Sequence, residues 1–342
     1  RDGNGAADHR TLFSDHFRQA ESGIGFSILA ERDAVYFTCI PAVWKMTDAN
    51  DDGVADTHDK VVDGFGVRVS FIGHDLHGII RGPDGRLYFS IGDRGFNVTT
   101  KEGKTQSASG RGAIFRCDDD GSNFEVFAHG LRNPQELTFD DHGNLFTFDN
   151  TGDIGDKARF VYVVENSDSG WDMSHQSAHH YAEVLDWGKF RPKLSMWVAE
   201  RMFDTWNEEQ PQWVYPPASH VGNGPSGVEW MTGDAIPGNL RGEFLMVNYR
   251  GAANNCAVLA VGMKPWGAGY TSTTVRSIVS GVGVADVELG YDGKLYMADF
   301  GAGWSINNNA SVQVAEAKDE ALRERGAAVA KLVKTGLSKT EA

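Results

Sequence analysis

Cysteine is scarce in this chain, and its few copies lie far apart. Only Cys39, Cys117 and Cys256 occur, and no Cys-x-x-Cys or Cys-x-x-Cys-His sequence is present. Thiolate zinc sites and covalently bound c-type haem need such spacings, so the sequence excludes both. A single disulfide stays open as an alternative, but we expect three small buried thiols.

Long apolar runs and basic residues are also lacking. No run of about 18 apolar residues occurs, which excludes a membrane-spanning helix. There are 32 Lys and Arg residues against 47 Asp and Glu residues, so the net charge is −15. A negative protein repels nucleic acid and anionic membrane surfaces. The composition therefore favours a soluble protein that binds a cation or a neutral or cationic partner.

A short phrase recurs along the chain. Each copy has a turn of the Asp-Gly type followed by apolar and aromatic residues, which is the pattern of a β-hairpin. The full copies are residues 83–88, 141–146 and 291–296, and looser copies are residues 32–36 and 240–244. Their central residues are spaced by 51, 58, 99 and 51 positions. Because 99 is nearly twice the other intervals, we expect a degenerate copy near residues 185–200.

A period of about 50 residues built from hairpins is typical of propeller blades. Five visible copies and one hidden copy predict an all-β fold, a six-bladed β-propeller over residues 1–310. From about Val312 the spacing turns helical, so residues 311–342 are expected to form a short C-terminal helical tail, either a linker or the start of a following domain. The chain starts at Arg1 with no Met or signal peptide, and we expect a mature or truncated piece of a longer protein. Loops from every blade of a propeller converge on an axial funnel, so functional residues are sought there.

An acidic loop follows the first strands. It places oxygen-bearing side chains at positions 1, 3, 5, 9 and 12 of a twelve-residue calcium loop, with Gly53 at position 6 for the sharp turn. These residues are Asp48, Asn50, Asp52, Asp56 and Asp59. We predict a structural calcium site, and the alternative is a solvated acidic turn. The run Asp118-Asp119-Asp120-Gly121 lacks this spacing and is expected to be a plain hairpin turn.

Two histidines precede the first full copy of the phrase. His74, Asp75 and His77 lie on the strand that enters that blade. A neutral imidazole with a carboxylate nearby suits general-base proton abstraction. Two histidines this close can also bind a metal, or one ring can be buried in a hydrogen bond. The spacing by itself leaves these alternatives open.

Other candidates follow later strands. Arg132, Asn133 and Gln135 flank a proline and offer hydrogen-bond donors suited to carboxylates or quinone carbonyls, the alternative being a turn with a surface arginine. Arg250 is a second candidate for binding an anion, and the alternative is an arginine in a solvated loop. In the loop after the strand 144–148, the oxygens of Asp149, Asn150 and Thr151 suit a second cation, and a loop of turn-forming residues is the alternative.

These phrases resemble, in order, the soluble quinoprotein glucose/sorbosone dehydrogenases, six-bladed propellers that use pyrroloquinoline quinone (PQQ). That family has a His eight residues before Gly-Pro-Asp-Gly, then Leu-Tyr and Gly-Asp, and residues 74–93 are similar to this pattern. Its Arg-Asn-Pro-Gln matches residues 132–135, and its metal loop is similar to residues 149–156.

A secreted branch named as membrane-bound dehydrogenases is more similar still. In that branch a propeller precedes helical repeats and a cytochrome c domain. Residues 74–95, 130–171 and 224–304 carry the likeness, which extends over nearly the whole chain. The resemblance implies a secreted protein, periplasmic or extracellular, with a cytochrome c as electron acceptor.

The resemblance also implies roles for the candidate residues. His74, beside Asp75, would be the general base that removes a hydroxyl proton from a sugar or alcohol as hydride passes to the PQQ C5 carbon. Arg132 and Asn133 would contact PQQ, and His77, Gln135 and Arg250 are further cofactor candidates. Asp149, Asn150 and Thr151 stand where the family holds its calcium, although the family's Glu-His-Gly-Pro is Asp-Asn-Thr-Gly here.

Two other functions compete with this interpretation. A calcium-dependent lactone or ester hydrolase would need several funnel carboxylates around one ion, and only Asp149, Asp153 and Glu229 are candidates. A non-catalytic propeller that binds or scaffolds a partner would have its histidines and arginines buried or scattered. The arrangement of His74, Arg132 and Asp149 discriminates among the three functions.

Overall fold

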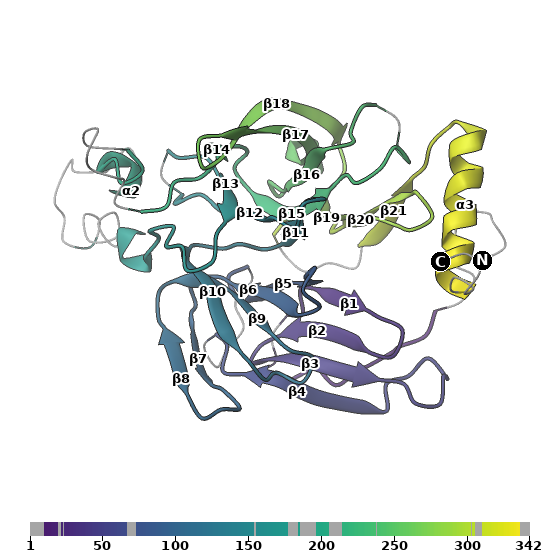
Figure 1. The fold of residues 1–342 in the computed structure, drawn as a ribbon, viewed down its shortest axis with the longest axis horizontal. Coiled ribbons are helices and arrows are strands. Elements are labelled where there is room, and N and C mark those ends of the chain that lie inside the picture. The colour runs from purple at the N-terminus through teal and green to yellow at the C-terminus, as the bar shows by residue number, and fades with distance from the viewer. Residues whose placement is uncertain are drawn as a thin grey trace. The chain divides into compact units, whose positions relative to one another are not determined.

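The computed structural model is built almost entirely from β-strands, which form five sheets of three or four antiparallel strands and one small hairpin (Figure 1). It describes residues 10–19, 22, 24–66, 73–153, 155–176, 184, 196–204, 214–236, 238–301, 303–304 and 310–335. The chain divides into two compact units, residues 1–134 with 171–174 and residues 135–170 with 175–342. The expected all-β propeller architecture is confirmed.

The first unit holds two blade sheets and the hairpin. The first sheet has the order β1-β2-β3-β4, and in Figure 1 these strands lie side by side in purple. The second sheet has the order β10-β9-β6-β5. The strands are β1 (Ile28–Ala30), β2 (Val35–Cys39), β3 (Ala42–Thr47), β4 (Thr57–Asp63), β5 (Leu76–Arg81), β6 (Leu87–Ile91), β7 (Phe96–Thr99), β8 (Thr105–Ala108), β9 (Gly112–Cys117) and β10 (Glu125–Leu131). Buried aromatic rings, among them Phe65, Phe89 and Phe115, form the core of this unit.

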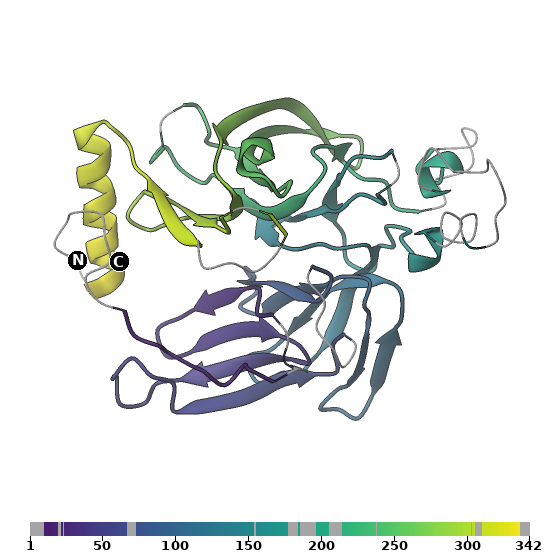
Figure 2. The same ribbon diagram turned by 180° about the vertical axis from the view of Figure 1, so that it is seen from behind.

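The second unit holds the other three sheets, with orders β11-β12-β13-β14, β15-β16-β17-β18 and β19-β20-β21. In Figure 2 the long β17–β18 hairpin and the yellow helix α3 (Glu320–Thr335) are seen from behind. The strands are β11 (Leu137–Phe139), β12 (Leu145–Asp149), β13 (Arg159–Val163), β14 (Ser219–His220), β15 (Pro225–Trp230), β16 (Glu243–Asn248), β17 (Ala257–Trp266), β18 (Gly269–Ser280), β19 (Val284–Leu289), β20 (Leu295–Asp299) and β21 (Ser311–Ala315). Short helices are η1 (Met173–Gln176), α2 (Met196–Ala199) and η2 (Ala253–Asn255).

The recurring phrase forms the turn between the first two strands of a blade. Gly85 adopts a φ of 82°, in the left-handed region that favours glycine, and closes the β5–β6 turn. Asp84 accepts a hydrogen bond from the hydroxyl of Tyr88 at 3.0 Å, and Asp292 accepts one from Tyr296 at 2.8 Å. The phrase therefore recurs because its Asp, Gly and Tyr together stabilise one kind of hairpin turn.

The prediction of six blades is wrong: the described part of the chain forms five blade sheets. The long interval between Gly143 and Gly242 contains one blade whose last strand comes late. β13 ends at Val163, yet its partner β14 begins only at Ser219, so the additional residues lie within a single blade. Of the stretch expected to hold a hidden copy, residues 185–195 lie outside the described residues, and the remainder includes the helix α2.

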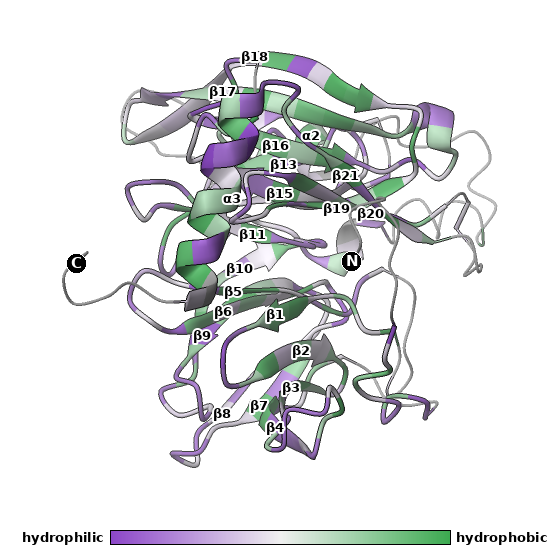
Figure 3. Cartoon of the chain, turned by 90° about the vertical axis from the view of Figure 1, so that its right-hand side faces the viewer, coloured by the Kyte–Doolittle hydropathy of each residue, from purple (hydrophilic) through white to green (hydrophobic). Residues whose placement is uncertain are grey.

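The predicted C-terminal helix is confirmed, but it begins later than expected. Residues Ser311–Ala315 form β21, which pairs with β20 and extends the fifth sheet past the expected boundary at residue 310. α3 then spans Glu320–Thr335, and Figure 3 shows hydrophilic and hydrophobic residues alternating along it. Gly326 packs against the β19–β20 turn, where a Cβ would lie 2.1 Å from the carbonyl oxygen of Asp292.

All three cysteines are free and buried, as expected. Among the described helices none combines the length and the apolar character needed to cross a bilayer.

Candidate functional site

One end of the second sheet gathers most of the predicted catalytic and cofactor-binding residues, but none of the predicted calcium ligands. Leu76 at the start of β5 pairs with Ile91 at the end of β6, and Ile91 pairs with Ala113 of β9. β10 runs antiparallel to β9 and ends at Leu131, at the same end of the sheet. The segments 74–75, 92–93 and 132–133 therefore leave the sheet at one edge, although they are far apart in sequence.

His74 and Asp93 form the central pair of this site. The Nδ1 atom of His74 lies 2.7 Å from Oδ1 of Asp93. The His74 side chain is 22% exposed, whereas that of Asp93 is only 3% exposed, so solvent and a small ligand can reach the imidazole but hardly the carboxylate. A carboxylate at Nδ1 favours the tautomer that carries its proton there, which leaves Nε2 as the basic nitrogen.

Trp171 holds the other side of Asp93. Its indole Nε1–H donates to Oδ2 of Asp93 at 2.9 Å, and its backbone amide donates to the carbonyl of Gly130 at 2.8 Å. The guanidinium of Arg132 lies over the Trp171 ring, 5.5 Å from its centroid. The backbone amide of Asp93 also donates to the carbonyl of Arg132 at 2.8 Å. Both oxygens of Asp93 are thus engaged, and the carboxylate is fixed in position.

His77 and Asn133 lie behind this pair and are buried. Nε2 of His77 is 3.0 Å from Oδ1 of Asn133, and the ring of Phe26 packs edge-on against the imidazole at 4.2 Å. Burial, with a smaller effect from the nearby His74, lowers the pKa of His77 to about 3, against the opposing effect of the Asn133 hydrogen bond. His77 is therefore a neutral buried ring in a hydrogen bond, which was one of the alternatives that the spacing left open.

Gly92 allows these side chains to come together. A Cβ at this position would lie 2.8 Å from Oδ1 of Asn133, 2.8 Å from the carbonyl oxygen of His74 and 2.9 Å from its Cα. These distances are below van der Waals contact, so no other residue fits without moving the site.

Asp75 is fully buried in the same unit. Its carbonyl oxygen accepts a hydrogen bond from the amide of Gly92 at 3.2 Å. Its negative charge, after the larger effect of burial, helps to raise the pKa of the Cys39 thiol to about 12. The carboxylate whose oxygen pairs with His74 is Asp93, and the catalytic role of Asp75 stays a prediction.

Gln135 and Arg250 belong to the second unit. Gln135 is half-buried and lies with Glu136 and Phe148 in a small recess near the start of β15. Arg250 is exposed, and its backbone amide donates to the sulfur of Cys256 at 3.2 Å. Their role in binding a cofactor stays a prediction.

Asp149, a predicted calcium ligand, forms a buried ion pair with Arg159 in the second unit. Arg159 also donates to the carbonyl of Ser169 at 2.8 Å, and its guanidinium stacks 3.9 Å from the centroid of the Trp197 ring. The neighbouring Asn150 accepts a hydrogen bond from the amide of Thr151 at 2.8 Å. The guanidinium of Arg159 thus already compensates the negative charge of Asp149.

In the acidic loop the side-chain oxygens accept hydrogen bonds from the loop's own backbone. Asp48 accepts from the amide of Gly53 at 2.8 Å, Asn50 from that of Asp52 at 3.0 Å, and Asp56 from that of Ala49 at 2.7 Å. Asp59 lies on β4, paired with Lys45 of β3. In the part of the chain that the structure describes, no group of three or more His, Cys, Asp or Glu side chains is arranged to hold a metal ion.

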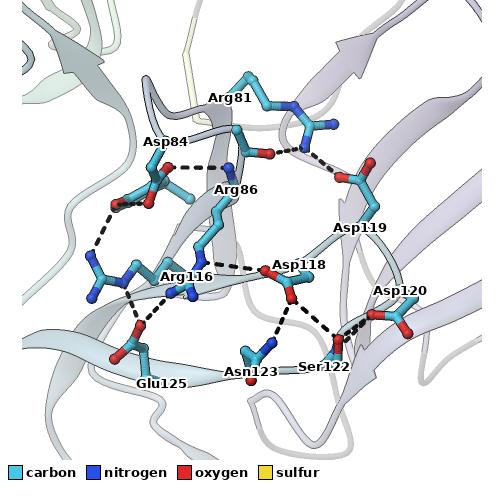
Figure 4. Close-up of polar contacts among 12 residues, drawn as sticks. Arg81, Asp84, Arg86, Arg116, Asp118, Asp119, Asp120, Ser122, Asn123 and Glu125 are labelled. Atoms are coloured by element: carbon cyan, nitrogen blue, oxygen red, sulfur yellow. Dashed lines mark hydrogen bonds and ion pairs between the residues drawn. The ribbon is translucent and has the colours of Figure 1, made fainter.

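The second acidic run is the plain hairpin turn that the sequence predicts. It joins β9 to β10, and Gly121 closes it with an amide that donates to the carbonyl of Asp118 at 2.8 Å. Figure 4 shows its carboxylates paired with basic and polar side chains. Arg86 lies 3.3 Å from Asp118 and Arg81 pairs with Asp119, while Lys101 lies 3.0 Å from Asp120. These ion pairs compensate the negative charges of the turn.

Four further carboxylates cluster in the second unit. They lie on or just before the first strands of its three blades: Glu136, Glu229, Asp286 and Glu288. Burial and the neighbouring carboxylates raise the pKa of Glu136 well above its usual value and that of Glu229 to about 9. Glu136 accepts the amide of Val228 at 3.0 Å and shares a hydrogen bond with Asp286, which requires a proton on one carboxyl. Glu288 is the exposed member, and its pKa rises less, to about 7.

Sequence reasoning assigned no role to Asp93, Trp171, Glu136 or Arg159. Asp93 carried one signal, since it ends the Gly-Asp pair that follows a strand of the recurring phrase. Trp171 and Glu136 carry no local signal, because their partners are distant in sequence. Arg159 meets Asp149, ten positions away, only through the register of β12 and β13.

A family described as "Domain of unknown function (DUF7133)" matches residues 1–329. None of the curated proteins matches the chain in sequence. Among solved structures, an oxidoreductase (glucose dehydrogenase) of Thermus thermophilus is 21% identical, with 87% of this chain and 85% of that chain covered and a TM-score of 0.59. The PQQ-bound aldose sugar dehydrogenase of Streptomyces coelicolor is 19% identical, with 83% of this chain and 74% of that chain covered and a TM-score of 0.51. The fold is thus that of the glucose dehydrogenase-like propellers.

Proposed function

The chain belongs to the family described as DUF7133, and we propose that it is a PQQ-dependent dehydrogenase that oxidises a sugar or another alcohol. The observation that carries the proposal is the His74–Asp93 pair beside Arg132 and Asn133, all at one edge of a blade. The likeness in fold to a PQQ-bound aldose sugar dehydrogenase supports it.

His74 is proposed as the general base. With its Nδ1 proton held by Asp93, the lone pair of Nε2 can accept a hydroxyl proton from the substrate. The imidazolium that forms lies 2.7 Å from a carboxylate, which stabilises its charge. Because the Trp171 indole fixes Asp93, the base keeps one orientation through the reaction.

The donors in this unit fit a cofactor that carries carboxylates and an ortho-quinone. Arg132 is 5% exposed and brings a permanent positive charge, and Asn133 brings an amide beside it. These two residues, with the Trp171 ring below the guanidinium, would hold PQQ. When bound, PQQ supplies a quinone that accepts two electrons from the alcohol. His77, Gln135 and Arg250 stay further candidates for contacts with it.

Further features of the family remain proposals for this chain. A secreted location, periplasmic or extracellular, and a cytochrome c acceptor follow from the resemblance. Calcium at the acidic loop or at Asp149–Thr151 rests on the sequence pattern alone. In the structure, side-chain oxygens of both segments are engaged with backbone amides or with Arg159. Calorimetric titration with calcium chloride tests the acidic loop: Asp52→Asn should remove one calcium-binding event, whereas Asp33→Asn, at an exposed turn, should remove none.

The proposed function is tested by adding PQQ, with and without calcium, to the purified chain. We expect saturable PQQ binding by calorimetry and dye-linked oxidation of an aldose. His74→Gln should lower the rate by about 10²- to 10⁴-fold while PQQ binding persists. His142→Gln changes an exposed turn histidine and should leave both unchanged. If PQQ does not bind, the proposal fails, and the non-catalytic propeller module and the calcium-dependent hydrolase are the functions left.

A further inference from the structure

A second site lies in the second unit, among residues that the proposed dehydrogenase function does not use. A cavity of about 580 Å³ opens there, which is within the usual range for small-molecule sites of about 300–1,000 Å³. Three segments line it: β13, the stretch 215–218 just before β14, and the tip of the β17–β18 hairpin. The lining residues are Tyr162, Tyr215, Pro216, Pro217, Ala218, Trp266, Ala268, Gly269, Tyr270 and Thr271.

Aromatic rings dominate this lining. Trp266 stands at the hairpin tip and is 69% exposed, an unusual degree for so large an apolar side chain. Tyr162 and Tyr270 pack edge to face at 5.0 Å, and both contact the ring of Phe146 in the core. Packing therefore fixes the two tyrosines. Nζ of Lys264 lies over the Trp266 ring, 5.9 Å from its centroid, but the side chain stays largely exposed to a ligand.

The hydroxyl groups of the two tyrosines are linked by one amide. Asn144 donates through Nδ2 to the hydroxyl oxygen of Tyr270 at 3.0 Å and accepts from the hydroxyl of Tyr162 at 3.3 Å. Asp140 fixes this amide by accepting its other hydrogen at 2.8 Å. Because the Tyr270 oxygen accepts a bond here, its own proton is directed to another acceptor. Both tyrosines line the cavity, so the Tyr270 hydroxyl has a proton to donate and the Tyr162 oxygen has acceptor capacity.

The lining carries no charge. None of its residues is Asp, Glu, Lys, Arg or His. Burial, with a smaller effect from Tyr162, raises the pKa of Tyr215 to about 12, so its phenol stays neutral. Burial likewise raises the pKa of Tyr270. An uncharged lining favours a neutral ligand, because no lining residue would pair the charge of an ionised one.

We propose that this cavity binds a neutral saccharide, separately from the His74–Asp93 site. The C–H groups on one face of a sugar ring are apolar and pack on an indole or phenol face, and the ring's hydroxyls both donate and accept hydrogen bonds. The exposed Trp266 and the Tyr162–Asn144–Tyr270 network supply both features. A proline-rich peptide also packs on aromatic grooves, but its backbone offers only carbonyl acceptors. It therefore has no group that could donate to the Tyr162 oxygen.

The test is calorimetric titration of the full chain with cellopentaose, xylopentaose, maltopentaose and, for comparison, a decamer of L-proline. We expect at least one pentasaccharide to bind. Trp266→Ala should weaken that binding about tenfold or more, and Tyr270→Phe, which removes only a hydroxyl, by about three- to tenfold. Trp304→Ala removes another exposed tryptophan, 65% exposed, and should leave affinity within about twofold.

Two further measurements separate this site from the proposed dehydrogenase. His74→Gln should leave pentasaccharide affinity unchanged, and Trp266→Ala should leave oxidation of a monosaccharide unchanged. The inference is overturned if no pentasaccharide binds, if binding is insensitive to Trp266→Ala, or if only the proline decamer binds. Circular dichroism of each variant verifies that its sheets are intact.

Discussion

The imidazole of His74 and the carboxylate of Asp93 lie 2.7 Å apart although 19 positions separate them in the chain. The hairpin of β5 and β6 accounts for this, since the two residues flank its open end. His74 is the accessible member and Asp93 the buried one, an arrangement that suits a base and the group that orients it.

Replacing Asp93 by Asn should impair the reaction without unfolding the protein. An amide oxygen can still accept from Nδ1 but cannot compensate an imidazolium, and the opposite amide orientation favours the wrong tautomer. We expect kcat to fall by about 10³-fold with a much smaller change in KM. Steady-state kinetics with PQQ and an aldose measure this, with the exposed Asp33→Asn as control. Equal activity of the two variants would refute the orienting role.

Gly92→Ala should damage the site through sterics. The new methyl group would lie 2.8 Å from both Asn133 Oδ1 and the His74 carbonyl oxygen. We expect a loss of about 2 kcal/mol or more in the free energy of unfolding of the first unit. Gly233→Ala is the matched control, since nothing lies within 4 Å of a Cβ at that position. Chemical denaturation of the two variants compares them, and similar midpoints would contradict this explanation.

His77 should make the first unit sensitive to acid. Its pKa is about 3 in the folded protein and near 6.5 when exposed, so between these values the unfolded state binds the additional proton. This contribution to stability is complete above pH 6.5 and is lost as the pH falls toward 3. Between pH 7.5 and pH 4.5 the free energy of unfolding of the wild type should fall by about 2 to 3 kcal/mol more than that of His77→Gln.

Protection of the β5 and β6 amides against hydrogen exchange, corrected for the intrinsic rate, measures this difference. His142→Gln, at an exposed turn, should follow the wild type at both pH values. A His77→Gln variant with the same pH dependence as the wild type would show that another group is responsible.

The carboxylate cluster should make the second unit less stable as the pH rises. The pKa of Glu229 is about 9 in the folded protein, against its ordinary 4.5, so the folded state keeps a proton that the unfolded state releases. Stability is complete below pH 4.5 and falls as the pH rises toward 9. Glu229→Gln should therefore be more stable than the wild type at pH 8, by about 4 kcal/mol, and within about 1 kcal/mol of it at pH 5. Glu324→Gln, on the exposed side of α3, is the control, and denaturant midpoints at both pH values give the comparison.

Asp149→Asn should be strongly destabilising, because it leaves the Arg159 guanidinium buried without its ion-pair partner. Removing one member of a buried pair costs about 3–5 kcal/mol. The double variant Asp149→Asn, Arg159→Met should recover part of this loss. Thermal unfolding of the three proteins tests the claim. A fully stable single variant would leave room for the calcium role predicted for Asp149.

Much of the blade architecture could be predicted from local patterns. The Asp-Gly-aromatic phrase stabilises its own hairpin turn through contacts within five residues, as Asp84 and Tyr88 show, so each copy is visible in the sequence. The number of blades could not be obtained in this way. β14 joins its blade after a long connection, and spacing cannot distinguish a late strand from an additional blade.

The sequence by itself determined that the chain forms β-hairpins, that Arg132 and Asn133 follow a strand, and that the chain has a helix near residue 342. It placed His74 on the entering strand, whereas β5 begins only at Leu76. Only the tertiary structure decided which side chains meet. It placed Asp93 and Trp171 against His74 and Arg132, Arg159 against Asp149, and four carboxylates together in the second unit. Turns and strand periodicity depend on neighbours in sequence, whereas these contacts depend on strand register and packing across sheets, which no local pattern encodes.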